Sequence, residues 1–116
     1  MIGGFRPSRI TGDFELLLIG YFENRKLYYS AKLKSGFTPH VKKQISSMIQ
    51  KIITKACPFV NLPEVRTGRW GEGLTEEEMS DYIWVKPKLV CRVQFVEWTL
   101  GNHLRHAKFV AMERRL

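Results

Sequence analysis

The spacing of apolar and polar residues changes several times along the chain, and each change predicts a different element. Residues 14–22 read Phe-Glu-Leu-Leu-Leu-Ile-Gly-Tyr-Phe, an apolar run without the gaps of a helix, which predicts a largely buried strand. Asn24 and Arg25 predict a tight turn, and the aromatic-rich residues 27–33 predict a second strand. We expect these two strands to pair as an antiparallel hairpin.

The clearest element is an amphipathic helix after this hairpin. Thr38 followed by Pro39 offers an N-cap and a first-turn proline, and the helix must end before Pro58. Its apolar residues recur three and four positions apart, at Val41, Ile45, Met48, Ile49, Ile52 and Ile53. The pattern therefore predicts one helix between strands.

The next part of the chain is less regular. Residues 57–73 are rich in proline and glycine and predict a long surface loop. Thr75 and the three glutamates after it have the hydroxyl cap and first-turn acids of a short helix that ends near Asp81. Residues 82–85 then predict a short strand before Pro87.

Two longer strands complete the pattern. Alternation predicts one strand over residues 89–99, Gly101 and Asn102 predict a turn, and residues 103–112 predict a final strand. Four clear strands, a short fifth and one helix predict a mainly β fold, an OB-fold Greek-key barrel of about five strands with one amphipathic helix between strands. An SH3-like barrel and an α+β sandwich fit the same pattern as alternatives.

Composition fits one folded domain. The 116 residues are 44% hydrophobic and 26% charged, enough for one core but not for two, so a single domain over residues 1–116 is expected. No window has the apolar length of a transmembrane helix, and residues 1–9 lack the apolar stretch of a secretory signal. A cytoplasmic monomer is therefore expected, with Cys57 and Cys91 as buried free thiols.

Charge narrows the class of partner. The chain has 19 Lys and Arg against 11 Asp and Glu, a formal net charge of +8. Such a surplus on a small domain attracts polyanions and speeds their encounter. Nucleic acid is the leading expected partner, and an anionic membrane surface is the second.

An ordered set of short segments resembles the C-terminal barrel of ATP-dependent DNA ligases, in particular the bacterial end-joining ligases. The resemblance begins with Ile-Gly-Gly-Phe-Arg-Pro at residues 2–7 and extends through nearly the whole chain. Its further segments are Leu17–Phe22, Lys26-Leu27, Ser35–Thr38, Cys57–Phe59, Trp84–Val90, Phe95–Thr99, Leu104–His106 and Phe109-Val110.

The resemblance implies a division of labour. A nucleotidyltransferase domain, in the same or a separate chain, would hold the catalytic lysine and use ATP and Mg²⁺, while the barrel closes over ATP during self-adenylation and then clamps nicked duplex DNA for sealing in repair or end joining. The Lys-x-Asp-Gly pattern of that lysine does not occur in the 116 residues. The chain by itself is therefore expected to be inactive and to need no cofactor of its own.

The last motif of the resembled family departs from its usual form here. The family has Arg-x-Asp-Lys, whereas residues 113–116 read Glu-Arg-Arg-Leu. Direct alignment puts Glu113 and Leu116 where the arginine and lysine should be. Arg114 and Arg115 are therefore the candidates for contacting the ATP pyrophosphate, after a shift of one residue.

Cations on or beside the predicted strands are the candidates for contacting DNA phosphates, and a solvated polar face is the alternative role for each. Arg105 is the best single candidate because it lies in the Leu-Arg-His segment that matches the ligase barrels. Arg69, next to Trp70 in the glycine-rich loop, is a candidate for lying across a groove. The candidates are Arg6, Arg9, Lys32, Lys34, Arg69, Lys88, Arg92, Arg105 and His106.

Aromatic residues give a second candidate surface for nucleic acid, which requires that they share one exposed face. Adjacent residues of a strand point to opposite faces, so we expect at least half of the set to lie in the core. The set is Tyr28, Tyr29, Trp84, Phe95 and Trp98.

No metal site is expected, because neither the histidines nor the two cysteines have zinc-ligand spacing. Two alternatives to a ligase barrel are open: a stand-alone barrel that binds single strands, and a barrel whose basic face docks an acidic protein.

Overall fold

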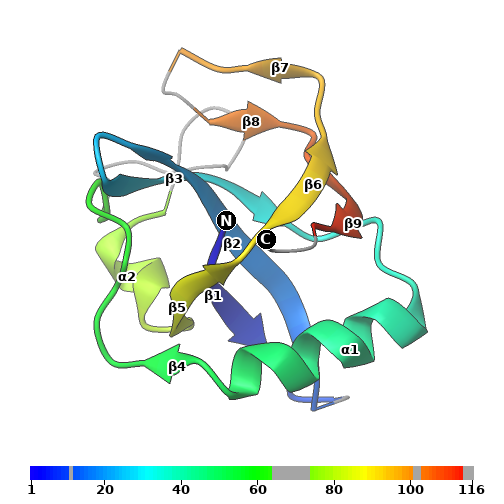
Figure 1. The fold of residues 1–116 in the computed structure, drawn as a ribbon. Helices are drawn as coiled ribbons and strands as arrows, with labels where there is room; N and C mark the ends of the chain where they lie inside the picture. Colours follow the sequence, from blue (N-terminus) through cyan, green and yellow to red (C-terminus); the bar gives the residue numbers. More distant parts are fainter. Residues whose placement is uncertain (11, 64–73, 101–102, 114–116) are drawn as a thin grey trace.

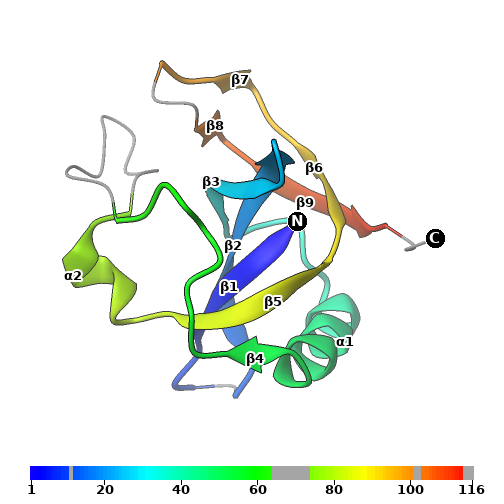
Figure 2. The same cartoon turned by 60° about the vertical axis from the view of Figure 1, so that its left-hand side comes forward.

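The strands of the chain curl into a small barrel with one longer helix at one end (Figures 1 and 2). The computed structural model describes residues 1–10, 12–63, 74–100 and 103–113. In chain order the elements are β1 (Ile2–Pro7), β2 (Phe14–Glu23), β3 (Lys26–Leu33), α1 (Pro39–Gln50), β4 (Ile53–Thr54), α2 (Glu76–Met79), β5 (Ile83–Leu89), β6 (Cys91–Gln94), β7 (Glu97–Trp98), β8 (Leu104–Arg105) and β9 (Lys108–Met112).

Strand pairing closes the barrel. An antiparallel sheet has the order β3-β2-β1-β5-β4, and β6, separated from β5 only by Val90, pairs with β9. The Phe109 amide of β9 donates to the Ser35 carbonyl at 2.8 Å, just after β3. The pairing therefore runs β1-β2-β3-β9-β6 and returns through β5 to β1, the Greek-key order of an OB barrel, which confirms the predicted fold class.

The apolar run of β2 is explained by burial on both of its faces. Leu17 and Ile19 point into the barrel, where they join a cluster that we call the inner core: Ile2, Phe5, Phe14, Leu17, Ile19, Ala31, Leu33, Ile45, Ile49, Val85, Leu104 and Phe109. Leu16 and Leu18 point the other way into an outer core, formed by Leu16, Leu18, Leu27, Tyr29, Phe59, Leu74 and Tyr82. Phe59, Leu74 and Tyr82, which lie between β4 and β5 in the chain, cover this second face, so the prediction of a largely buried strand is confirmed.

Local signals were accurate at the hairpin and at the start of α1. Asn24 and Arg25 have φ of 51° and 66°, as the two central residues of a type I′ turn require. The Thr38 hydroxyl accepts from the Val41 amide and Pro39 begins α1, as predicted. The helix ends earlier than the apolar pattern indicated, because Ile53 leaves it to pair with Val85 in the β4–β5 ladder.

The prediction of a short helix near Thr75 is also confirmed. The Thr75 hydroxyl accepts from the Glu78 amide while the Glu78 carboxylate accepts from the Thr75 amide, a complete capping box for α2.

The strand boundaries of the last third were predicted wrongly. Strand β5 does not stop at Pro87 but runs through it, because residues 85–88 bulge between the pairs Ile2–Leu89 and Gly4–Trp84 and a proline in a bulge breaks no ladder bond. The predicted strand 89–99 is interrupted at Val90 and again after Gln94. The predicted strand 103–112 is broken at His106, whose φ of 55° is incompatible with a strand.

The two cysteines match their prediction in part. Cys57 and Cys91 form no disulfide, as predicted, but both are partly exposed rather than buried. The turn at Gly101 and Asn102, and residues 64–73 of the predicted loop, lie outside the described residues. In the part of the chain that the structure describes, no helix is long and apolar enough to cross a membrane.

Candidate nucleic-acid interface

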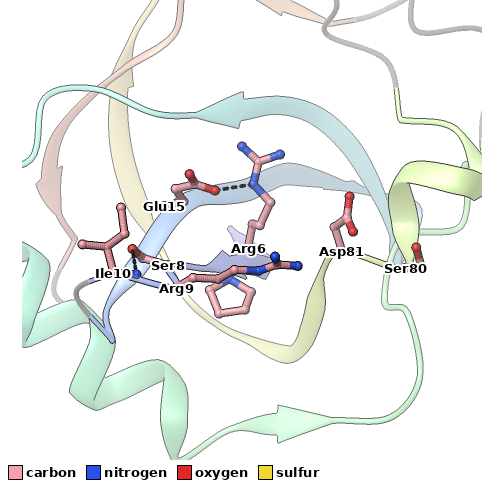
Figure 3. Close-up of a pocket in the computed structure, with 8 residues that line it drawn as sticks. Arg6, Ser8, Arg9, Ile10, Glu15, Ser80 and Asp81 are labelled. Carbon is pink, nitrogen blue, oxygen red and sulfur yellow. Dashed lines mark hydrogen bonds and ion pairs between the residues drawn. The ribbon is translucent and has the colours of Figure 1, made fainter.

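A surface hollow of about 620 Å³ lies where the loop between β1 and β2 faces the turn after α2 (Figure 3). It is lined by two guanidinium groups, two carboxylates and two serines, contributed by Arg6, Arg9, Glu15, Asp81, Ser8 and Ser80. The structure thus brings together two of the predicted DNA-contacting cations, Arg6 and Arg9. Neither the carboxylates nor the serines were predicted to belong to the site.

Arg6 is held in place from two sides. Its Nε donates to Glu15 Oε2 at 2.7 Å, and its guanidinium carbon lies 5.9 Å from the centre of the Tyr82 ring. Burial raises the pKa of Tyr82, so this ring is a neutral phenol at neutral pH. In Figure 3 the two terminal nitrogens of Arg6 point away from Glu15, which leaves a preorganised fork of donors of the kind that binds phosphate oxygens.

Arg9 is exposed, and its side chain extends across the hollow toward the side of Asp81 (Figure 3). Two guanidinium groups and two carboxylates make the hollow locally charge-balanced. Long-range attraction of an anion therefore comes from the surplus of +8 on the whole chain, and the guanidinium groups supply short-range donors once it arrives.

Lys32 lies in β3 beside the outer core, not on an open face. Its Nζ is 3.0 Å from Glu78 Oε2, and its side chain is 12% exposed. Burial tends to raise the pKa of Glu78, but the hydrogen bond and charge of Lys32, with the Thr75 contacts, outweigh it and hold the pKa below its usual value of 4.5. The pair fastens α2 to the barrel.

Replacing Lys32 by methionine is expected to lower the free energy of unfolding by about 1 kcal/mol at neutral pH. The Glu78 pKa is lowered in the folded state, so the pair stabilises the fold above about pH 4.5 and this contribution is lost as pH falls through the lowered pKa. Urea unfolding of the unaltered protein and of Lys32→Met, measured over this pH range, should give free energies of unfolding that become equal in acid. Lys34→Met, two residues further along at an exposed position, is the matched control; an equal loss there would contradict the assignment.

Two more predicted cations take part in ion pairs at the other end of the barrel wall. Arg92 in β6 has Nη2 2.6 Å from Glu113 Oε1 and remains largely exposed. Arg105 in β8 has Nε 2.9 Å from Glu97 Oε1 without hydrogen-bond alignment, and its side chain is 23% exposed. An exposed pair such as that of Arg92 is weak, so a phosphate can compete for its guanidinium group, whereas Arg105 is mostly buried and less open to such competition.

The remaining predicted cations do not gather with the hollow. His106 is exposed in the turn between β8 and β9, Lys34 is exposed just after β3, and Lys88 is exposed on β5. Arg69 and the predicted ATP contacts Arg114 and Arg115 lie outside the described residues.

The aromatic set divides into three groups. Tyr29 lies in the outer core and Trp84 packs against it, Tyr28 is half-buried outside both cores, and Phe95 and Trp98 are exposed. Fewer than half of the set are therefore core residues, and that expectation was wrong. Tyr21, which the sequence analysis did not single out, stacks on Tyr28 with ring centres 5.8 Å apart.

Of the two residues that orient Arg6, one had a signal in the sequence that was not used. Glu15 is the one charged residue in the apolar run 14–22, which marks a position facing water at the start of β2. Tyr82 directly follows an acidic segment, but nothing local indicates that it supports Arg6 from 76 positions away.

Within residues 1–10, 12–63, 74–100 and 103–113, no group of three or more His, Cys, Asp or Glu side chains could hold a metal ion.

Comparison with known proteins assigns the chain to a protein family. The family described as ATP dependent DNA ligase C terminal region matches residues 11–115. The chain is 26% identical over 112 residues to the multifunctional non-homologous end joining protein LigD of Pseudomonas aeruginosa, an alignment that covers 94% of this chain and 12% of that protein.

Solved structures give the same picture of the fold. The chain aligns with the ligase domain of M. tuberculosis LigD with a TM-score of 0.79 at 22% identity. It aligns with mycobacterial DNA ligase D complexed with ATP and MES with a TM-score of 0.73 at 25% identity. Both alignments cover 97% of this chain but only 33% and 32% of the solved chains, so the chain spans about a third of the ligase structures that it matches.

Proposed function

This chain belongs to the family of C-terminal regions of ATP-dependent DNA ligases, and from that membership we propose that it is the DNA-binding barrel of such a ligase, active in end joining or nick repair. The observation that carries the proposal is the family match over residues 11–115, nearly the whole chain. The LigD relative, although 26% identical, supports the end-joining branch. The proposed partner is a nucleotidyltransferase domain, in the same protein or in a separate chain.

The hollow between the β1–β2 loop and the turn after α2 supports a role in holding the DNA backbone. Arg6 is oriented by Glu15 and Tyr82 and Arg9 is exposed beside it, so together they offer paired donors to adjacent phosphate oxygens. Phosphate contacts fix the position of a protein on duplex DNA without reading its sequence. Sealing any nick, whatever its sequence, requires that kind of contact.

ATP and Mg²⁺ belong to the partner domain in this proposal. Bound there, ATP would supply the adenylate that activates the DNA 5′-phosphate, with release of pyrophosphate, and Mg²⁺ would neutralise phosphate charge. Arg114 and Arg115 remain the predicted residues through which the barrel would contact the nucleotide pyrophosphate. In this proposal the barrel itself acts as a monomer that positions the nick.

The test is fluorescence anisotropy of the chain with labelled nicked duplex, intact duplex and single strand, each over a series of salt concentrations. We expect binding to duplex, strongest at the nick, with affinity that falls steeply as salt rises. Failure to bind duplex at low salt would overturn the DNA-binding role. A preference for the single strand over both duplexes would instead support the stand-alone single-strand-binding barrel.

A further inference from the structure

Four aromatic rings that belong to neither core contact one another, two of them half-buried and two exposed. Tyr21 of β2 stacks on Tyr28 of β3 with an interplanar angle of 20°, Trp98 of β7 meets Tyr21 edge to face at 5.6 Å, and Phe95 meets Trp98 at 5.8 Å. Phe95 and Trp98 are 41% and 50% exposed. We call Tyr21, Tyr28, Phe95 and Trp98 the aromatic row.

Trp98, the member of the row that lies in β7, is on a paired strand. Strands β7 and β8 form an arm in which the Val96 amide donates to the Arg105 carbonyl at 3.0 Å and the Thr99 amide donates to the His103 carbonyl at 2.7 Å. His103 is buried and meets the Tyr29 ring at 5.6 Å, which joins the arm to the outer core. Trp98 is therefore carried by a paired strand that contacts the outer core.

The row lies apart from the arginine hollow. Figures 1 and 2 place the β7–β8 arm at the end of the molecule away from α1, while the loop between β1 and β2 lies at the α1 end. The contacts that orient Arg6 come from Glu15 and Tyr82, and neither belongs to the row. The two surfaces can therefore contact different parts of one DNA.

We propose that the aromatic row binds unpaired nucleobases, such as those of a single-stranded overhang at a DNA end. An exposed ring face stacks on any base, because every base has a π face, and this makes such binding independent of sequence. Strand alternation puts Tyr21 on the same side of β2 as Leu17 and Ile19, which point into the barrel, so the ring lies at the end of this inner side. The β7–β8 arm, between β6 and β9, brings Trp98 against it.

Charge favours nucleic acid over an apolar protein surface as the occupant. Arg25 and Lys26 are exposed at the tip of the hairpin that carries Tyr21 and Tyr28, within reach of the backbone of a strand whose bases stack on the row. The chain as a whole has a charge of +8. Stacking surfaces beside cations are the arrangement that binds single strands without sequence preference.

The inference rests on the proposed DNA-binding function, and the experiment separates the two. Anisotropy is measured with three duplexes of equal length: one blunt, one with a short thymidine overhang, and one whose overhang has the same phosphates but abasic sugars. We expect the thymidine overhang to bind about tenfold more tightly than the abasic one. Because both overhangs carry the same charge, this ratio measures contact with the bases alone.

Trp98→Ala is expected to bring the ratio close to one, and Trp98→Phe, which keeps a stacking ring, to retain most of it. Phe22→Ala is the matched control, because Phe22 is equally exposed at 50% but, as the residue next to Tyr21 in β2, points to the opposite face. If Trp98→Ala alters the arm, Tyr28→Leu on β3 gives an independent test of the same ratio.

Each outcome has a defined meaning. No binding to any of the three duplexes would overturn the proposed function. Equal binding of thymidine and abasic overhangs, with the blunt duplex still bound, would overturn the inference alone and is the result expected if the row docks a protein. A ratio that Phe22→Ala reduces as much as Trp98→Ala would also overturn it.

Discussion

Replacing Gly36 by alanine is expected to cost the barrel at least about 3 kcal/mol of unfolding free energy, a large part of the stability of a domain of this size. Gly36 has φ of 97°, where a side chain costs about 1 to 2 kcal/mol. A Cβ there would lie 2.2 Å from the Phe109 carbonyl oxygen and 2.8 Å from its amide nitrogen. Since both contacts are with backbone, β9 must move away from β3.

That movement would open the barrel at its seam. It would break the hydrogen bond from the Phe109 amide to the Ser35 carbonyl and separate the Phe37 and Phe109 rings, which stack 4.7 Å apart. Urea unfolding monitored by tryptophan fluorescence would measure the loss. Gly12→Ala is the matched control, because Gly12 also has a positive φ, of 78°, but has open space around it. Equal losses at both glycines would mean that β9 does not lie against Gly36.

The parts of the fold that could be predicted from sequence are those with a local cause. Thr38 and Pro39 determine where α1 begins, Asn24 and Arg25 adopt the positive φ of their turn, and Thr75 caps α2 through groups three residues away. Each depends on atoms close together in the chain. The sequence pattern therefore placed these elements correctly.

The parts that could not be predicted depend on partners far along the chain. Alternation over residues 89–99 shows that the backbone is extended, but it does not show that β6 turns away to pair with β9 while β7 leaves the wall to form an arm. The exit of Ile53 from the helical pattern depends on Val85, and the bulge around Pro87 depends on β1. Closure through Ser35 and Phe109 has no local signal at all.

The candidate site shows the same division. Composition and spacing predicted that Arg6 and Arg9 were cations beside strands, but they could not distinguish them from Lys32, which is in an ion pair at the edge of the outer core. The difference is decided by Glu78 for Lys32 and by Glu15 and Tyr82 for Arg6. Such pairings follow from tertiary packing. The sequence alone therefore identified the candidate cations, and only the fold distinguishes those that line the hollow from those held in ion pairs elsewhere.

The joint replacement Arg6→Gln with Arg9→Gln is expected to weaken binding to nicked duplex by about tenfold per guanidinium group, which corresponds to roughly 1.4 kcal/mol each. Each lost phosphate contact also reduces the number of counterions released on binding. The slope of log affinity against log salt should therefore become shallower by about 1 per arginine. Anisotropy of a nicked duplex without overhangs, over a salt series, measures both quantities.

Two controls separate local contact from overall charge. Arg25→Gln with Lys26→Gln removes the same two charges, but beyond the far end of β2, whose ten residues span roughly 33 Å from the Glu15 end of the strand. If the hollow contacts phosphates, this control loses much less affinity on the nicked duplex; an equal loss would show that only net charge matters. Arg6→Lys with Arg9→Lys keeps the charges but removes the paired guanidinium donors, so it should retain the salt slope while binding more weakly. Full retention of affinity by the lysine variant would contradict a bidentate contact and leave Arg6 and Arg9 as simple positive charges.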